Sequence, residues 1–307
     1  MYYKTLPNHA KPEFDVKAHF NQFKKRNIIF NASSNYSLCD HHVGCLSFKT
    51  VINGEEWYGI GNRQVAVRPR KFLMMNNDQG YSSRIDGDED VKTLSIFFKE
   101  EFDSLVFQDL LYKEESLLDN PFMTSLINPE FFQTLSDIDE ELQRKLNILT
   151  LALDGYEYSS SSSSSSRIDE YLVFILGDLI RTQVLKSRET KRIGAIKQHT
   201  RVEIFKRLCV AKDIIESSYM EQPSLEAISN ISCLSIPQLI RHFKSVFHRT
   251  PHQYLIHIRL DRAVELLNYT NKPIHEVTWR CGFENVSAFC RAFKSEYGIQ
   301  PARFRKL

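Results

Sequence analysis

The chain has 307 residues, of which 42% are hydrophobic and 25% charged, and its formal net charge is +2. This composition is ordinary for a soluble globular protein, and the length is sufficient for two domains with sizeable cores. No apolar run approaches the roughly 20 residues that cross a bilayer. The N-terminus also lacks the apolar core and small-residue cleavage site of a secretory signal. We therefore expect a cytoplasmic protein without a membrane segment.

The charge is distributed unevenly along the chain. From residue 201 to residue 307 there are 16 Lys and Arg against 10 Asp and Glu, together with five histidines, whereas the first 200 residues have a net charge of −4. A basic C-terminal third on an acidic remainder indicates a partner that is a polyanion. The asymmetry is weak support on its own, because solvated helical surfaces are often mildly basic.

The first predicted elements are strands, between residues 46 and 98. β-Branched and aromatic residues flank Asn53-Gly54, which predicts a hairpin, and Gly61-Asn62 marks a second turn. Two further short strands, at 71–75 and 91–98, are separated by a polar segment at 76–90 that we expect to be a loop. Short strands at this spacing are typical of a small sandwich or barrel.

The apolar period changes after residue 100. The segments 140–153 and 168–185 place apolar residues three and four apart, which predicts amphipathic helices. Between them, eight serines at Ser159–Ser166 cannot bury apolar area, so we expect a flexible, exposed loop there. The charged segment 186–201 is expected to link the two halves of the chain.

The last third of the chain repeats one pattern. Arg241, Phe243, Lys244, Ser245 and Pro251 each recur 50 positions later, as Arg291, Phe293, Lys294, Ser295 and Pro301. Each copy has a short apolar-striped helix, a tight turn and a second helix, and a long helix from Pro251 to about Asn268 separates the copies. Ser224, Ser235 and Thr250 are expected N-caps, the last two in capping boxes with Gln238 and Gln253.

This pattern predicts two helix-turn-helix motifs. Apolar residues four apart pack the second helix of each copy across the first, at Leu239 and Phe243 or at Phe289 and Phe293. The opposite face is left polar, as a recognition helix in the major groove requires, because Arg pairs with guanine and Asn or Gln with adenine. Helix-turn-helix spacing also occurs in plain helical bundles, but two matching copies favour DNA binding.

Residues 205–307 resemble the DNA-binding domain of the AraC/XylS family of bacterial transcription regulators. The resemblance rests on "SIPQLIRHFKSVFHRTPHQYLIHIRLDRAVELL" and "PIHEVTWRCGFENVSAFCRAFKSEYGIQPARFRK". It implies that Ile236, Pro237, Ile240 and Arg241 lie near bases in the first motif, and Val286, Ser287, Cys290 and Arg291 in the second. The remaining candidate DNA-binding residues are Ser235, Gln238 and Asn285 at the helix starts, and Lys244, Lys294 and Arg303 as phosphate contacts.

The first motif departs from the family pattern. Cys233 and His248 stand where glycines are usual, so either the backbone avoids a left-handed residue or some strain is tolerated. Pro237 and Ile240 replace larger or polar side chains. We therefore expect the second motif to provide more of the base readout.

The N-terminal half resembles the family's cupin-like β-barrel more loosely. His41 and His42 are adjacent and would point to opposite faces of a strand, and the next histidine is His199, so a cupin metal site is not indicated. The six cysteines have no C-x-x-C spacing, which favours reduced thiols over a zinc site and offers no reactive thiol for a methyl-acceptor enzyme. The aromatics Phe48, Trp57, Tyr58 and Phe72, with Arg68 or Arg84 nearby in sequence, would line an effector pocket, or these aromatics would fill a closed core.

The sequence thus predicts an α+β protein: an N-terminal cupin-like β-barrel with a helical arm, then an all-α domain with two helix-turn-helix units joined by a long helix. Residues 1–190 are the expected sensor and dimerisation domain, with strands at about 40–100 and helices at about 100–190, and residues 200–307 the DNA-binding domain. The expected function is transcription regulation, with no catalytic residue, metal or cofactor. Expected partners are double-stranded promoter DNA, RNA polymerase, an unknown small-molecule effector and a second copy in a homodimer. The alternative is a cupin-type metalloenzyme with an accessory helical domain.

Overall fold

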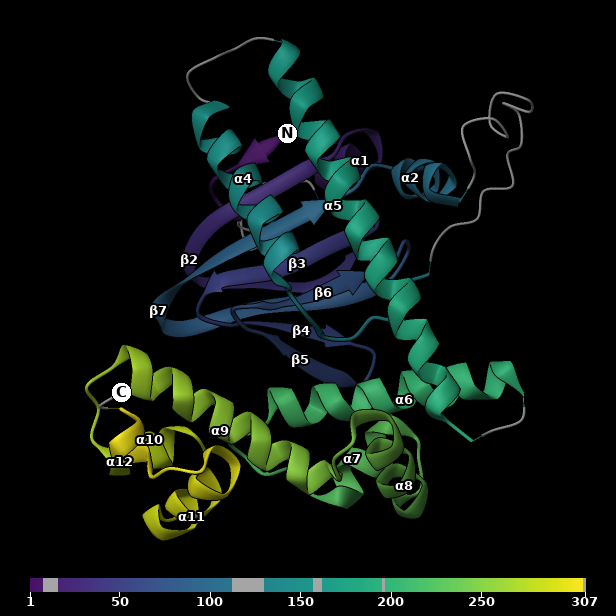
Figure 1. Cartoon of the computed structure of the whole chain (residues 1–307). Helices are drawn as coiled ribbons and strands as arrows, with labels where there is room; N and C mark the ends of the chain where they lie inside the picture. The colour runs from purple at the N-terminus through teal and green to yellow at the C-terminus, as the bar shows by residue number, and fades with distance from the viewer. Residues whose placement is uncertain (8–15, 112–129, 157–161, 195–196, 306–307) are drawn as a thin grey trace. The chain divides into compact units, whose positions relative to one another are not determined.

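A computed structural model describes residues 1–7, 16–111, 130–156, 162–194 and 197–305 (Figure 1). The chain divides into two compact units, Met1–Arg188 and Glu189–Leu307, which are taken in turn below. Every described strand lies in the first unit, and the second unit is helical. The predicted α+β class is therefore confirmed.

The described strands of the first unit form one sheet. The strands are β1 (Tyr2–Tyr3), β2 (Ile28–Val43), β3 (Ser47–Asn53), β4 (Glu56–Ile60), β5 (Arg63–Val67), β6 (Lys71–Met75), β7 (Gly80–Phe97) and β8 (Ser136–Asp137). Their order is β1-β2-β7-β3-β6-β8, with β4 pairing to both β5 and β7. All pairs are antiparallel except β1 with β2.

Strand β7 organises this sheet. One edge of it pairs with β2 from Gly80 to Phe97, while its other edge pairs with β4 at its start and with β3 at its end. The β2–β7 ladder has two register shifts, and such irregularities bend and twist a sheet. The result is a half-barrel, with one face turned inward.

Two expectations for the strands are wrong. The segment 80–90 is the first half of β7 and not part of a loop, because its polar residues pair with β2 and β4. The turn at Asn53-Gly54 is present, with Gly54 at φ +79°, but it does not close a hairpin. Strands β3 and β4 follow one another along the same edge of β7 and do not pair, whereas the turn at Gly61 does join a hairpin, β4–β5.

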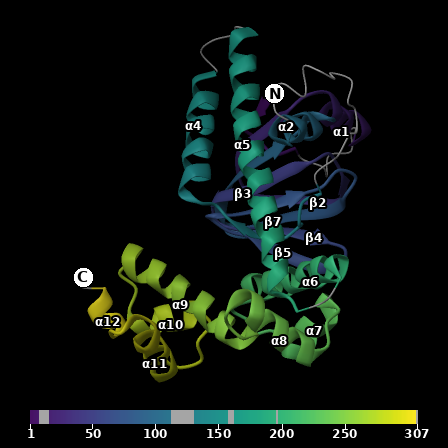
Figure 2. The same ribbon diagram turned by 45° about the vertical axis from the view of Figure 1, so that its right-hand side comes forward.

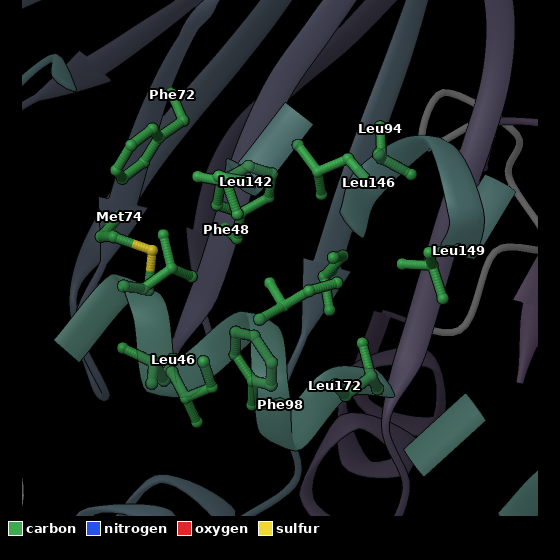
Figure 3. Packing of buried hydrophobic residues seen from close by; sticks show 14 of the residues in the cluster. Leu46, Phe48, Phe72, Met74, Leu94, Phe98, Leu142, Leu146, Leu149 and Leu172 are labelled. Carbon is green, nitrogen blue, oxygen red and sulfur yellow. The ribbon is translucent and has the colours of Figure 1, made fainter. Parts of the chain in front are cut away.

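The helices of this unit are α1 (Val16–Lys25), α2 (Phe102–Leu111), α4 (Glu140–Tyr156) and α5 (Ser162–Glu189). Helices α4 and α5 cover one face of the sheet, whereas Phe23 of α1 packs with Phe30 and Phe97 on the other face. Leu142, Leu146 and Leu149 of α4 and Leu172 of α5 pack with sheet residues such as Phe48 in one apolar core (Figure 3). Helices α4 and α5 lie side by side (Figures 1 and 2), joined by an ion pair between Lys145 and Asp178.

The structure describes the second part of the serine run, and that part is helical. Ser162–Ser166 belong to the first turns of α5, which corrects the expectation of a loop there. Serine is common at helix starts, and the amphipathic segment that follows provides the packing that sustains the helix. Residues 159–161 lie outside the described part of the chain.

The second unit consists of short and long helices. They are η1 (Thr190–Arg192), α6 (Gln198–Ser217), α7 (Leu225–Ser232), α8 (Ile236–Phe247), α9 (Pro251–Tyr269), α10 (Ile274–Arg280), α11 (Val286–Tyr297) and α12 (Pro301–Phe304). Helix α9 contacts α6 and α8 on the first-motif side and α10 and α11 on the second-motif side (Figure 1). None of the helices among the described residues is long and apolar enough to span a membrane.

Candidate nucleic-acid interface

The first helix-turn-helix motif consists of α7, the turn at 233–235 and α8. Ser224 caps α7 by accepting a hydrogen bond from the backbone N–H of Ala227 at 3.1 Å. Ile228 of α7 and Leu239 and Phe243 of α8 are buried, so the predicted apolar stripe fixes α8 across α7. The capping pair at the start of α8 is present, since Gln238 Oε1 accepts from the backbone N–H and the hydroxyl of Ser235.

The second motif repeats this construction with α10 and α11. Phe289 and Phe293 of α11 are fully buried and lie 5.6 Å apart between ring centroids. They pack with Val277 of α10 and with Leu260 and Ala263 of α9 in one cluster. Because both α10 and α11 bury apolar residues against α9, the second motif is anchored to the helix that also supports the first.

Each motif has a left-handed residue in its turn and another directly after its second helix. Gly282 and Gly298 have φ of +80° and +76° in the second motif. In the first motif, Cys233 and His248 adopt φ of 54° and 60°. The first motif therefore keeps the same backbone path without glycine, and of the two alternatives the sequence left open, tolerated strain is the one observed.

The faces of α8 and α11 that do not touch the core are polar and accessible. None of the 14 candidate DNA-binding residues is buried, and eleven of them are exposed: Ser235, Pro237, Gln238, Arg241, Lys244, Asn285, Val286, Ser287, Arg291, Lys294 and Arg303. Ile236, Ile240 and Cys290 are half-buried. Two such helices in one compact unit present the geometry of a double recognition surface.

The second unit matches known DNA-binding domains. Residues 228–307 match the profile of a helix-turn-helix domain family. The probable transcriptional regulator LumQ of Photobacterium leiognathi is 36% identical over 91 residues, which are 30% of this chain and 37% of that protein. The transcriptional activator RhaS of Mannheimia succiniciproducens is 34% identical over 91 residues, or 30% of this chain and 34% of that one. Residues 228–307 of the second unit thus match a helix-turn-helix domain, and the relatives that share this part of the chain are transcription regulators.

The match is confined to this domain. The chain spans only about a third of the length of these relatives. Among solved structures, the DNA-binding domain of AdpA, in complex with a target DNA, is 28% identical and covers 33% of this chain and 90% of that one, with a TM-score of 0.31.

Within this helix-turn-helix domain, the basic side chains on α8 and α11 differ in their surroundings. Arg241 Nη2 lies 3.1 Å from Nε2 of the buried His242. Burial, and then the Arg241 charge, lower the pKa of His242 below its usual 6.5, which keeps the ring neutral and able to accept this hydrogen bond. Lys244, Arg291 and Lys294 form no ion pair with any described residue, so their charges are directed to solvent.

Two of the candidate base-contacting residues also stabilise the starts of helices in this domain. Asn285 Oδ1 accepts a hydrogen bond from the N–H of Ala288 at 2.8 Å and thereby caps α11. Gln238 Oε1 is held by Ser235 as described above. The side-chain oxygens of both residues are therefore committed to the helix starts, and their NH₂ groups are the atoms directed toward a ligand.

Sequence reasoning missed Arg259, a buried arginine in α9. Its Nε donates to the carbonyl of Tyr219 at 2.8 Å, and its guanidinium lies 5.8 Å from the centroid of Phe283. A Cβ at Gly282 would meet this Nε at 3.0 Å, so the turn of the second motif needs glycine for space as well as for φ. Arg259 falls in the apolar series Leu255, Ala263, Leu267, and a charge in that stripe was the available signal.

A polar network was also missed. Arg249, between α8 and α9, donates to Glu296 Oε1 of α11 at 2.9 Å, and His257 Nδ1 of α9 lies 3.3 Å from the same oxygen. The Tyr297 hydroxyl donates to Asp261 Oδ1 at 3.0 Å. The Arg249 hydrogen bond and charge hold the pKa of Glu296 below its usual range, so this carboxylate stays ionised. No sequence pattern marks these pairs, because their partners are 36 to 47 positions apart.

Cys281 and Cys290 of this domain are poor nucleophiles. Burial raises the pKa of Cys281 to about 12 and raises that of Cys290 above its usual value, so neither thiol ionises readily near neutral pH. Among the described residues, no group of three or more His, Cys, Asp or Glu side chains is arranged to hold a metal ion.

The first unit contains a cavity on the inner face of the half-barrel. Of the aromatics considered from the sequence, Tyr58 lines this cavity, whereas Phe48 and Phe72 belong to the core beneath α4 and α5. Arg68 is paired with Glu55 at 2.8 Å and does not line it. Sequence alternation identifies residues that share a face of a strand, but it does not identify which face encloses the cavity.

Proposed function

We propose that this chain is a sequence-specific DNA-binding transcription regulator. The supporting observation is that α8 and α11 expose matching polar faces, each with an Arg and a Lys one turn apart, within one compact unit. Helix α9 has 19 residues and at 1.5 Å per residue is about 28 Å long. That length is compatible with recognition helices in successive major grooves, about 34 Å apart.

The proposed mechanism separates positioning from readout. Lys244, Lys294 and Arg303 contact phosphates and fix the register of the protein on the duplex. Arg241 and Arg291 then contact base edges, together with the small and apolar residues around them: Ser235, Ile236, Pro237, Gln238 and Ile240 in the first motif, and Asn285, Val286, Ser287 and Cys290 in the second. Arg291 carries more of the readout, because Arg241 is already engaged by His242.

The decisive test replaces Arg291 with Ala. At a matched operator, found by selection from random duplexes with the wild-type chain, we expect a loss of about 1–3 kcal/mol in binding free energy, with a smaller loss on random DNA. Arg262→Ala is the matched control, because Arg262 is exposed on α9 and pairs only with Glu265. Equal binding of the Arg291 variant and wild type to both duplexes contradicts the assignment of α11 as a recognition helix.

The first unit would regulate this activity. Its cavity supports binding of a small effector. Ile148 and Leu151 of α4 and Phe174 of α5 are exposed apolar residues, and they support a homodimer contact through this helical layer. RNA polymerase is the further partner that a promoter-bound regulator would contact.

A further inference from the structure

The cavity of the first unit has a volume of about 60 Å³ and is lined by β2, β3, β4, β7, α1 and the N-terminal segment. Its polar walls include His42, Lys49, Glu56, Tyr58 and Tyr81, and Phe97 forms an apolar wall. The alternation of strands explains this lining. Phe48 of β3 points to the core beneath α4 and α5, so the next residue, Lys49, points to the opposite face and into the cavity.

Lys49 is a buried cation, and no residue in the described part of the chain accepts a hydrogen bond from it. Its residue is 3% exposed, and its Nζ lies 3.5 Å from the ring centroid of Phe97 and 5.5 Å from that of Tyr81. Among the described residues, no oxygen accepts a hydrogen bond from Nζ and no carboxylate lies within ion-pairing distance. Cation–π contacts offset part of the desolvation cost, but the hydrogen-bonding capacity of the ammonium is unused.

Among the described residues, Glu56 is the one carboxylate that lines the cavity, and another group already donates a hydrogen bond to it. Glu56 is 7% exposed, and Tyr58 donates a hydrogen bond to it. Burial raises the pKa of Glu56 to about 7 and lowers that of Lys49 to about 8, and each charge moderates the shift of the other. Near neutral pH, therefore, Glu56 is often uncharged while Lys49 remains largely protonated.

We propose that this cavity binds a small organic anion, a carboxylate with a compact apolar body. Its oxygens accept hydrogen bonds from Lys49 Nζ, and its apolar part contacts Phe97 and the adjacent Phe23 and Phe30, which also line the cavity. A cationic ligand is disfavoured, because Lys49 repels it and Glu56 already has a donor. The inference deepens the effector part of the proposed function.

Calorimetry on the full chain without DNA tests the head-group preference. The probes are butyrate and phenylacetate, with phenylacetamide and phenethylamine as the neutral and cationic relatives of the latter. We expect at least one carboxylate to bind at least tenfold more tightly than the amide and the amine. Equal binding of the amide or the amine, or no binding of either carboxylate at millimolar concentration, overturns the proposal.

Lys49→Met distinguishes a ligand-binding role from a structural one. A buried ammonium without an acceptor contributes little stability, so this variant should keep or raise the melting temperature while losing at least tenfold in carboxylate affinity. Lys92→Met, at an exposed position of β7, is the matched control and should bind as wild type does. A Lys49→Met chain that retains carboxylate binding rejects the site. If instead it fails to fold, Lys49 is structural, and the proposal is rejected as well.

The pH profile provides a second readout on wild-type protein. Affinity for the carboxylate should fall as pH rises from 6 to 9, because Glu56 first becomes an anion that repels the ligand and Lys49 then loses its proton. The other titratable groups facing Glu56 and Lys49 are His42 and Cys39 of β2, Cys45 between β2 and β3, Tyr58 of β4 and Tyr81 of β7. An affinity that is constant or rises over this range contradicts the proposal. Because no DNA is present, these outcomes are independent of whether the chain binds DNA.

Discussion

Each helix-turn-helix motif has two residues with positive φ, one in its turn and one directly after its second helix, and only the second motif uses glycine at both positions. The left-handed conformation costs a residue with a Cβ roughly 1–2 kcal/mol. Glycine avoids this cost, but it loses more conformational entropy on folding, which offsets part of the gain. Cys233 is exposed at the end of α7, and it makes only weak sulfur contacts to backbone carbonyls. Glycine at position 233 or 248 would therefore make the first motif more stable than the present residue does.

Cys233→Gly and His248→Gly should each raise the free energy of unfolding by about 0.5–1 kcal/mol. The reverse change should be costly at Gly282, where a Cβ would also meet Arg259 Nε at 3.0 Å and the Tyr219 carbonyl at 3.1 Å. Gly298→Ala is the matched control, because no atom lies within 4 Å of the added Cβ and only the conformational cost remains. Urea denaturation measures all four. A Gly282→Ala chain as stable as Gly298→Ala would show that the contact with Arg259 is not a constraint.

At the scale of elements, the helices follow from local signals, whereas much of the sheet does not. The sequence predicts the bounds of α8, α9 and α11 closely, from the capping boxes, Pro251 and the spacing of apolar residues. Strand β2 was missed over residues 28–39, and the first half of β7 was assigned to a loop, because polar residues there gave no alternating pattern. These two strands stabilise each other through a long antiparallel ladder, and such pairing between distant segments leaves no mark in either segment alone.

The functional residues also divide into those that the sequence identifies and those that only the folded structure reveals. The repeat with a period of 50 residues identifies the recognition helices, since it copies both the apolar stripe and the polar face. It does not identify Lys49, whose importance comes from three strands that enclose it, or the network around Glu296, whose members belong to different elements. Contacts that fix the orientation of elements are thus visible only in the folded chain.

The network around Glu296 joins three elements, and we predict that it sets the orientation of α11 relative to the first motif. Glu296→Gln removes the charge that pairs with Arg249 and contacts His257. Because this pair is partly exposed, the loss should be about 0.5–1 kcal/mol, or a two- to fivefold weaker affinity for DNA with both half-sites. Binding to a duplex with one half-site should be unchanged, because each motif stays intact.

Glu265→Gln is the control for this variant, since Glu265 forms a similar ion pair with Arg262 on the exposed side of α9. Electrophoretic mobility shift or fluorescence anisotropy with the two duplexes provides the comparison. An equal loss on the one-site and two-site duplexes would indicate that Glu296 acts within the second motif alone, and Glu296 would then not be a positioning residue.

For the whole molecule, the separation of charge has a measurable consequence. The residues from 201 to 307 carry a net charge of +6, whereas the first 200 residues carry −4. Binding to DNA through the basic part releases condensed cations from the phosphates, so affinity should fall steeply with salt. The acidic remainder disfavours contact with DNA outside the recognition helices, because like charges repel.

The slope of log affinity against log salt concentration tests which lysines contact phosphates. Each phosphate contact contributes about −0.9 to this slope, so Lys244→Gln and Lys294→Gln should each reduce its magnitude by about 1 and weaken binding to all sequences alike. Arg291→Ala, in contrast, should chiefly reduce the preference for the matched site. Lys92→Gln, an exposed lysine of the first unit, should leave the slope unchanged. If the slopes of the Lys244 and Lys294 variants equal that of wild type while their affinities fall, these side chains act on base edges or on helix packing, and the division between positioning and readout would have to be reversed.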